Sequence, residues 1–132
     1  MEIKEAEHLV EFALRNIYGY EVRYRKSLTG CVYSKKKLVY IPSIKSRKSL
    51  YIALHELYHV ERAENKLKKI EVNVEEMRAE LFAHRKMREM GFAVPTSQTQ
   101  RAKRYVAYKV RKAIKRGKKL ENIDKEVLRF IK

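Results

Sequence analysis

The chain has 132 residues, 45% of them hydrophobic, and its 32 Lys and Arg against 16 Asp and Glu give a formal net charge of +16. This length and apolar content predict a folded protein with one core and exclude a chain too polar to fold. The single cysteine, Cys31, excludes an intramolecular disulfide. Because no apolar run reaches the roughly 20 residues of a membrane span and the acidic start lacks a signal region, we expect a cytoplasmic protein.

The positive charge narrows the choice of partners. A field of this sign attracts polyanions such as nucleic acid, acidic membrane surfaces and acidic proteins. A thermophile surface also carries many charges, but there both signs rise together, whereas here the cations are twice as numerous as the anions. The excess of cations therefore favours an anionic partner.

The first third of the chain predicts a helix followed by a small antiparallel sheet. Apolar residues recur at helical spacing over residues 2–18. Residues 20–25 alternate between apolar and polar side chains, and residues 30–34 and 37–41 form a predicted hairpin that ends at Pro42. An edge of this sheet can bind an extended peptide by strand addition. The alternative is that the strands only cover the core.

Residues 43–69 contain neither Gly nor Pro and predict a helix, with Ser46 or Ser49 as its N-cap. This helix carries the pattern H-E-x-x-H, formed by His55, Glu56 and His59. Residues four apart lie on one face of a helix, so both imidazoles can aim at one point. A Zn²⁺ ion accepts two such nitrogens, each at about 2.0 to 2.1 Å. The spacing therefore predicts two metal ligands.

Glu56 stands beside this pair and has a different predicted role. Its side chain is rotated to one side of His55, so it can reach a water at the metal without taking a coordination position, and it can act as general base for that water. The alternative is that a helix rich in histidine produced the pattern by chance. The presence of a third metal ligand elsewhere in the chain would distinguish the two interpretations.

A second helix is predicted over residues 73–90, before Gly91. Three of its polar residues, Glu76, Glu80 and His84, are spaced by four and are candidates for the third ligand. Glu76 also completes a capping box, whereas Glu80 faces the histidines if the helix folds back through a connection near residues 66–72. The spacing leaves the choice open. The apolar residues that predict the helix are Val74, Met77, Leu81, Met87 and Met90.

The motif HELYH at residues 55–59, followed by EMRAE at residues 76–80, resembles the gluzincin metallopeptidases, in particular the minigluzincins and the ImmA/IrrE group. In those families a downstream E-x-x-A-[DN] supplies the third zinc ligand through its Glu, and the Asp or Asn supports the site. The resemblance implies that Glu76 is the ligand and Glu80 the supporting residue. Glu80 is longer than the Asp or Asn of the pattern, which leaves the choice between the two carboxylates open.

The resemblance covers roughly residues 50–90. It implies an α+β, zincin-like fold in which a motif helix and a backing helix follow an N-terminal helix and a small antiparallel sheet. It also implies one Zn²⁺ per chain and hydrolysis of peptide bonds in a protein or peptide substrate. On this basis we expect a metallopeptidase domain over residues 1–95 and a basic helical appendage over residues 96–132.

The appendage is the most basic part of the sequence, with thirteen Lys or Arg against three acidic residues over residues 101–132. We expect two amphipathic helices after a hinge at residues 91–100. Their cations can neutralise phosphates without sequence specificity, and Tyr105 and Tyr108 can stack on bases. The alternatives are structural helices with a solvated face, or a lid over the cleft. The candidate nucleic-acid-binding residues are Arg101, Lys103, Arg104, Lys109, Arg111, Lys112, Lys115 and Arg116.

The sequence therefore favours a small zinc metallopeptidase whose basic appendage can bring it to nucleic acid or to acidic substrates. The alternative from another class is a catalytically inactive, zincin-fold protein that binds nucleic acid or has a regulatory role. If the histidine motif is a coincidence, the chain is a structural helical protein that binds no zinc.

Overall fold

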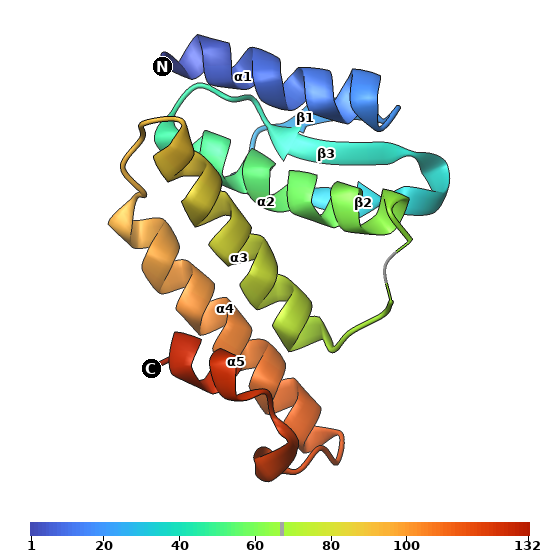
Figure 1. The fold of residues 1–132 in the computed structure, drawn as a ribbon, viewed down its shortest axis with the longest axis vertical. Coiled ribbons are helices and arrows are strands. Elements are labelled where there is room, and N and C mark those ends of the chain that lie inside the picture. Colours follow the sequence, from blue (N-terminus) through green and yellow to red (C-terminus); the bar gives the residue numbers. More distant parts are fainter. Residues whose placement is uncertain (67) are drawn as a thin grey trace.

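The computed structural model describes residues 1–66 and 68–132, and these form five α-helices and a three-stranded sheet (Figure 1). The α+β class predicted from the sequence is confirmed. A π-helical turn, Ala13–Ile17, continues the first helix. The helices are α1 (Ile3–Phe12), α2 (Arg47–Glu64), α3 (Val72–Glu89), α4 (Thr96–Lys115) and α5 (Lys125–Phe130), and the strands are β1 (Glu21–Arg25), β2 (Cys31–Tyr33) and β3 (Leu38–Pro42).

The sheet has the order β1-β3-β2 and is mixed. The predicted hairpin of β2 and β3 is confirmed, since these strands pair antiparallel. The prediction of a wholly antiparallel sheet is wrong, because β1 pairs with β3 in parallel. The most apolar strand takes the middle position: Val39 and Ile41 of β3 are fully buried. The chain therefore passes from β1 to the far edge of the sheet before β3 returns between the two.

Helix α2 lies at the centre of the fold, in contact with α1, β2, β3 and α3. It starts with a capping box, in which the Ser46 hydroxyl accepts a hydrogen bond from the Ser49 backbone N–H and the Ser49 hydroxyl accepts one from the Ser46 N–H. Its residues Leu50, Leu54 and Val60 are fully buried in the main core. Burial on several sides holds this helix, and with it the histidine motif, in one position.

Helix α3 folds back along α2, as the sequence predicts (Figure 1). It ends at Glu89 with Met90 as its C-cap, and the next residue, Gly91, has a φ of +85°, a left-handed conformation that glycine adopts without steric cost. The predicted connection over residues 66–72 includes residue 67, which lies outside the described residues. The pairing of α2 with α3 brings both helical motifs of the sequence to the same interface.

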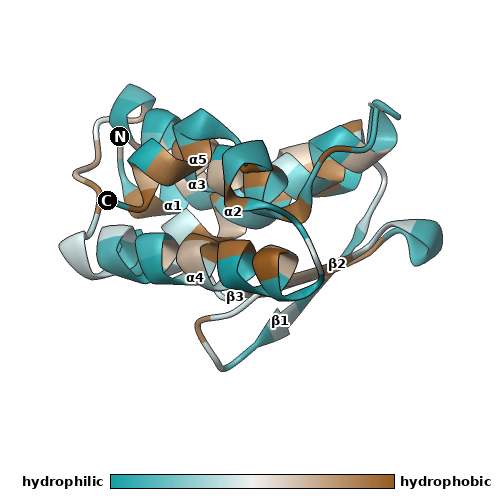
Figure 2. Ribbon diagram, turned by 90° about the horizontal axis from the view of Figure 1, so that it is seen from below, coloured by the Kyte–Doolittle hydropathy of each residue, from teal (hydrophilic) through white to brown (hydrophobic). Residues whose placement is uncertain are grey.

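Helices α4 and α5 pack against α3 and extend the molecule with a second apolar cluster. Hydrophobic and hydrophilic residues alternate along these helices in Figure 2. Because α4 begins at Thr96, directly after Pro95, the predicted hinge over residues 91–100 is too long. A proline with φ near −63° suits the start of a helix. The buried members of the second cluster are Val74, Met77, Val106, Val110, Ile123 and Val127.

Candidate metal centre

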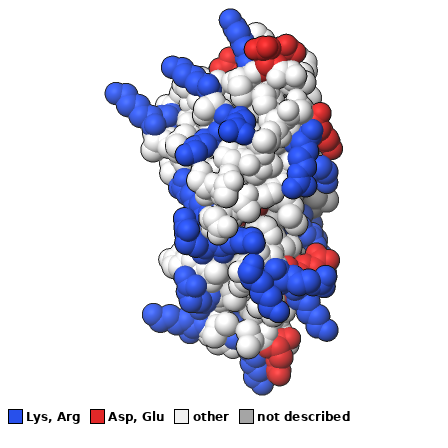
Figure 3. All heavy atoms as spheres, turned by 90° about the vertical axis from the view of Figure 1, so that its left-hand side faces the viewer, with Lys and Arg blue, Asp and Glu red and all other residues white. Residues whose placement is uncertain are grey.

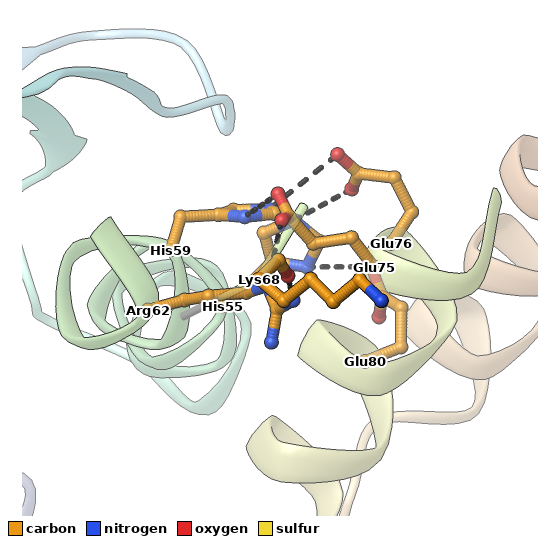
Figure 4. Close-up of polar contacts among 7 residues, drawn as sticks. All are labelled: His55, His59, Arg62, Lys68, Glu75, Glu76 and Glu80. Atoms are coloured by element: carbon orange, nitrogen blue, oxygen red, sulfur yellow. Dashed lines mark hydrogen bonds and ion pairs between the residues drawn. The ribbon is translucent and has the colours of Figure 1, made fainter. Parts of the chain in front are cut away.

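The two motif histidines lie one turn apart on the face of α2 that meets α3 (Figure 4). Their Nε2 atoms are 3.1 Å apart. The side chains are mostly buried, with 15% of His55 and 13% of His59 exposed. The structure thus brings together the two imidazole nitrogens that the spacing of four residues predicts.

Glu76 extends from α3 toward both nitrogens. Its Oε2 lies 3.1 Å from Nε2 of His55, and its Oε1 lies 3.4 Å from Nε2 of His59. These three residues could hold a metal ion. Ligand atoms at 2.0 to 2.1 Å from a tetrahedral zinc are about 3.3 to 3.4 Å apart. The observed separations of 3.1 to 3.4 Å are close to that spacing, so the three donors could hold one metal ion between them.

The other nitrogen of each histidine faces a second carboxylate. Oε1 of Glu80 lies 2.8 Å from Nδ1 of His55, and Oε2 of Glu75 lies 3.0 Å from Nδ1 of His59. A carboxylate accepts a hydrogen bond from the Nδ1–H group and leaves the Nε2 lone pair free for a metal, which is how metal-binding histidines are usually oriented. The arrangement therefore selects the tautomer that a metal site needs.

Two further side chains hold these supporting carboxylates. Arg62 Nε donates to Glu75 Oε1 over 3.0 Å, and the buried hydroxyl of Tyr51 donates to Glu80 Oε2. Burial, and then the Glu80 charge, raise the pKa of Tyr51 far above its ordinary value, so it remains a donor. Both carboxylates are thus fixed by partners on α2.

The carboxylates also govern the protonation of the metal-free site. Burial lowers the pKa of His55, but hydrogen bonds to Glu76 and Glu80 outweigh it and raise the pKa to about 10. Burial likewise lowers the pKa of His59, while Glu75 and Glu76 raise it to about 9. Burial raises the pKa of Glu76, yet the two histidines bring it well below its usual range. Without a metal, protons on the imidazoles therefore balance the buried negative charge.

Glu56 differs from the other three glutamates because one of its carboxylate oxygens, Oε2, has no hydrogen-bond partner in the described part of the chain. Its side chain is only 6% exposed, and its Oε2 is buried without a hydrogen bond among residues 1–66 and 68–132. Burial raises the pKa of its carboxyl. Gly30 packs directly against it, since a Cβ atom at Gly30 would lie 2.8 Å from Cδ and 2.9 Å from Oε2 of Glu56. A buried carboxylate is thus held beside the histidines and left free to accept a proton.

All four glutamates and both histidines line a cleft of about 740 Å³, and the Glu75 side chain is 35% exposed. One wall is the loop before β2 together with the edge strand β2 itself, and the opposite wall is α4. From α4, Arg101, Tyr105 and Tyr108 line the cleft. Burial, followed by the charges of Glu76, Glu56 and Glu80, raises the pKa of Tyr105 to about 12. A neutral phenol therefore faces the acidic site.

The three candidates for the third ligand differ in their contacts with the histidine nitrogens. Glu76 meets both Nε2 atoms, whereas Glu80 meets only the Nδ1 atom of His55. His84 lies against the ring of Tyr51, with the ring centroids 5.4 Å apart, and its Nε2 has no hydrogen-bond partner in the described part of the chain. Burial lowers the pKa of His84. The side chain of His84 is thus part of the surroundings of Tyr51 and Glu80.

Five residues that contribute to the site are not among those predicted for it from the sequence: Tyr51, Arg62, Glu75, Gly30 and Tyr105. Tyr51 and Arg62 lie four residues before His55 and three residues after His59, so their helical spacing places them on the histidine face. Glu75 precedes Glu76 directly, and nothing in its spacing distinguishes it. The contributions of Gly30 and Tyr105 come from elements far away in the sequence, and no local pattern points to them.

The basic residues of the appendage are distributed over two environments. Of the eight predicted residues, three are half-buried: Lys103, Lys109 and Lys112. The other five are exposed, and Arg101 among them also lines the cleft. None of the helices in the described residues is long and apolar enough to cross a membrane.

The chain was compared with protein families, with curated proteins and with solved structures. No family model, curated protein sequence or solved structure matches the chain.

Proposed function

We propose that this chain is a zinc-dependent metallopeptidase of the gluzincin type, with His55, His59 and Glu76 as zinc ligands and Glu56 as general base. The observation that carries the proposal is the buried, unpartnered carboxylate of Glu56 next to a set of three donors. A charge without a hydrogen bond is costly to bury. Such a group is expected where catalysis, and not stability, determines the residue.

The choice of zinc is supported by the donors. Two imidazoles and one carboxylate are ligands that zinc prefers, and three protein ligands leave a coordination position open, which is typical of catalytic sites. When bound, zinc lowers the pKa of water toward about 7 and polarises a carbonyl group. Glu75 and Glu80 hold the imidazoles in the metal-binding tautomer.

The role of Glu56 follows from its surroundings. Its carboxylate can take a proton from the attacking water and then deliver that proton to the departing amine. Burial raises the pKa of Glu56 from that of an ordinary carboxyl, and a base works best when its pKa approaches the working pH. Gly30 keeps one side of the carboxylate covered by backbone.

The cleft suits a polypeptide substrate. Strand β2 forms one edge of the sheet and contributes Val32 to the lining of the cleft. An extended peptide can pair with such an edge through main-chain hydrogen bonds, which are the same for every sequence. This geometry supports peptide-bond hydrolysis over a reaction on a small molecule.

The proposal is tested by metal analysis and proteolysis on the same preparations. We expect about one zinc per chain in the untagged protein and cleavage of an unfolded substrate such as β-casein. Glu56→Gln should keep the zinc and lose activity by about 100-fold or more, because general base catalysis contributes about 10² to 10⁴. His59→Ala should lose both zinc and activity.

A matched control lies on the same helix. Glu64 contacts Lys37 and the hydroxyl of Tyr20, away from the cleft lining, so Glu64→Gln should leave zinc content and activity unchanged. Equal activity in Glu56→Gln and wild type would refute the assigned role. Stoichiometric zinc without any cleavage would favour an inactive metal-binding protein, and a failure to take up added zinc would refute the metal site.

A further inference from the structure

Helix α4 has an unusual charge for its length. Its twenty residues include seven Lys or Arg and no Asp or Glu. On the face drawn in Figure 3, Lys and Arg are spread over the length of the molecule, and the fewer acidic residues lie near its edges. The exposed residues on α4 that carry the following argument are Arg101, Arg104, Tyr105, Tyr108, Arg111 and Lys115.

Among the described residues, no glutamate or aspartate forms an ion pair with a cation of α4. Arg62, Arg85 and Lys86, on α2 and α3, all form ion pairs with glutamates. In contrast, no cation of α4 forms an ion pair with any residue in 1–66 or 68–132. Arg101 donates to the neutral backbone carbonyl of Leu28, whereas Lys103 donates to a backbone oxygen of Lys132, the last residue. The charges of Arg104, Arg111 and Lys115 therefore remain available for an external anion.

Two exposed aromatic rings lie among these cations. Tyr105 is 37% exposed and Tyr108 is 47% exposed. The Lys109 amino group lies 5.3 Å from the ring centre of Tyr105, and the Lys112 amino group lies 5.3 Å from that of Tyr108. Aromatic faces beside cations are the two components from which proteins build binding surfaces for single-stranded nucleic acid.

The helical spacing arranges these residues in a continuous strip. Arg104, Arg111 and Lys115 are seven and four residues apart, so they follow one line along the helix with Tyr108 beside them. Arg101 and Tyr105 lie next to that line on the cleft side. From residue 101 to residue 115 the strip is about 21 Å long at 1.5 Å per residue. It is long enough to follow several nucleotides of an extended strand.

The apolar face of α4 argues against a second possible role of a basic helix, which is binding to an acidic membrane. An amphipathic helix binds an acidic membrane by inserting its apolar face. On α4 that face consists of Ala102, Val106 and Val110, and all three are buried in the protein. The helix therefore offers cations and tyrosines to a partner, but no apolar side for insertion into lipid.

We propose that the exposed strip of α4 binds single-stranded nucleic acid. Arg104, Arg111 and Lys115 contact backbone phosphates, and Tyr108 stacks on a base. Binding of this kind tolerates any sequence, because phosphates and ring faces are common to all nucleotides. The proposal goes beyond the proposed peptidase activity and does not rest on it, since none of these residues touches the metal site.

The position of the strip has a consequence for the cleft. Arg101, Tyr105 and Tyr108 line the cleft and also border the strip. A bound strand would therefore pass along the cleft mouth. Proteins associated with that strand would be held close to the site.

The test uses fluorescence anisotropy of a labelled 16-nucleotide oligothymidylate, with and without zinc. We expect the triple variant Arg104→Glu, Arg111→Glu and Lys115→Glu to bind at least tenfold more weakly. The plot of log affinity against log salt should lose about 2 units of slope, because each phosphate contact contributes about 0.7 on a single strand. Binding by the wild type should not depend on zinc, so this result stands apart from any failure of the peptidase.

The matched control removes the same charge elsewhere. Lys4, Lys35 and Lys36 are exposed on α1 and in the connection between β2 and β3. Changing all three to Glu should leave the affinity within about twofold and the salt slope unchanged. If this control loses as much affinity as the α4 variant, or if wild type does not bind, the strip is not a binding site and the proposal fails.

Variants of Tyr108 test whether the partner of the strip is nucleic acid or another polyanion. Tyr108→Ala should weaken oligonucleotide binding between about fivefold and 150-fold, while Tyr108→Phe should bind like wild type, because stacking needs only the ring. Polyglutamate and phosphatidylserine vesicles should compete only weakly. Strong competition by either of them, with no effect of Tyr108→Ala, would overturn the proposal in favour of an acidic protein or a membrane surface.

Discussion

Four glutamates surround the histidine pair, and their positions give them different chemistry. Glu76 faces the Nε2 atoms, Glu75 and Glu80 face the Nδ1 atoms, and Glu56 faces none of them. Hydrogen bonds to the histidines lower the pKa values of Glu75 and Glu76, although burial opposes the effect. Only Glu56 has both the location and the unused oxygen that a general base needs.

At the scale of one residue, a substitution of Gly30 tests whether the position of the Glu56 carboxylate matters for catalysis. Gly30→Ala would place a Cβ atom 2.8 Å from Cδ of Glu56, so the carboxylate must move. A displacement of about 1 Å can cost about 100-fold in rate, and we expect a loss between tenfold and 100-fold with zinc content unchanged. The measurement is kcat/KM on a peptide substrate alongside metal analysis.

Ser27→Ala, in the same loop but exposed, is the control and should keep full activity. Wild-type activity in Gly30→Ala would show that the position of Glu56 does not limit catalysis.

At the scale of elements, α3 connects the metal site to the basic helix. One of its faces presents Glu76 and Glu80 to α2, and another packs Val74 and Met77 against α4 and α5. Since α4 also forms a wall of the cleft, the second apolar cluster positions that wall relative to the proposed metal ligands. The appendage is therefore part of the cleft architecture.

Met77→Ala tests this connection. The side chain is 2% exposed in the second cluster, and removal of a buried methionine costs about 2 to 5 kcal/mol in unfolding free energy. Leu81, one turn further along α3, is 45% exposed, so Leu81→Ala should change the unfolding free energy by no more than about 0.5 kcal/mol. Urea unfolding of the metal-free proteins measures both values. Equal effects in the two variants would contradict the assignment of the second cluster.

At the scale of the whole molecule, an acidic interior site lies beneath a basic surface. The metal-free cluster gains stability from protonated histidines whose pKa values, about 10 and about 9, exceed the ordinary value of about 6.5. That contribution is fully present below about pH 6.5 and is lost as the pH rises through 9 to 10. Metal-free protein should therefore become less stable over this alkaline range.

Zinc binding should show the opposite dependence on pH. Zinc requires neutral imidazoles, so at pH 7 each ion displaces about two protons, and its apparent affinity should rise by up to about 100-fold per pH unit until the histidines lose their protons near pH 9. Calorimetry in phosphate and in Tris measures the proton release from the difference in heat. Zinc binding that does not depend on pH between 6 and 8 would contradict the protonation described for the metal-free site.

The sequence by itself determined the features that lie within single elements. The spacing of His55 and His59 places them on one face because a helix repeats every 3.6 residues, and Ser46 and Ser49 cap that helix through local hydrogen bonds. The alternation of residues 20–25 marked a strand, and the pattern at 30–41 marked a hairpin. Glu76 and Glu80 were both found, since each lies on a helix face that local spacing defines.

Only the tertiary structure decided how these elements meet. The packing of α2 on α3 places Glu76 at the Nε2 atoms and Glu80 at Nδ1 of His55, a choice that spacing along α3 leaves open. Tertiary packing also decides that β3 lies in the middle of the sheet and that Gly30 lies against Glu56. It likewise places α4 as a wall of the cleft. Periodicity fixes which residues share a face, but the partner of that face depends on burying apolar surface from distant segments, and no local pattern encodes it.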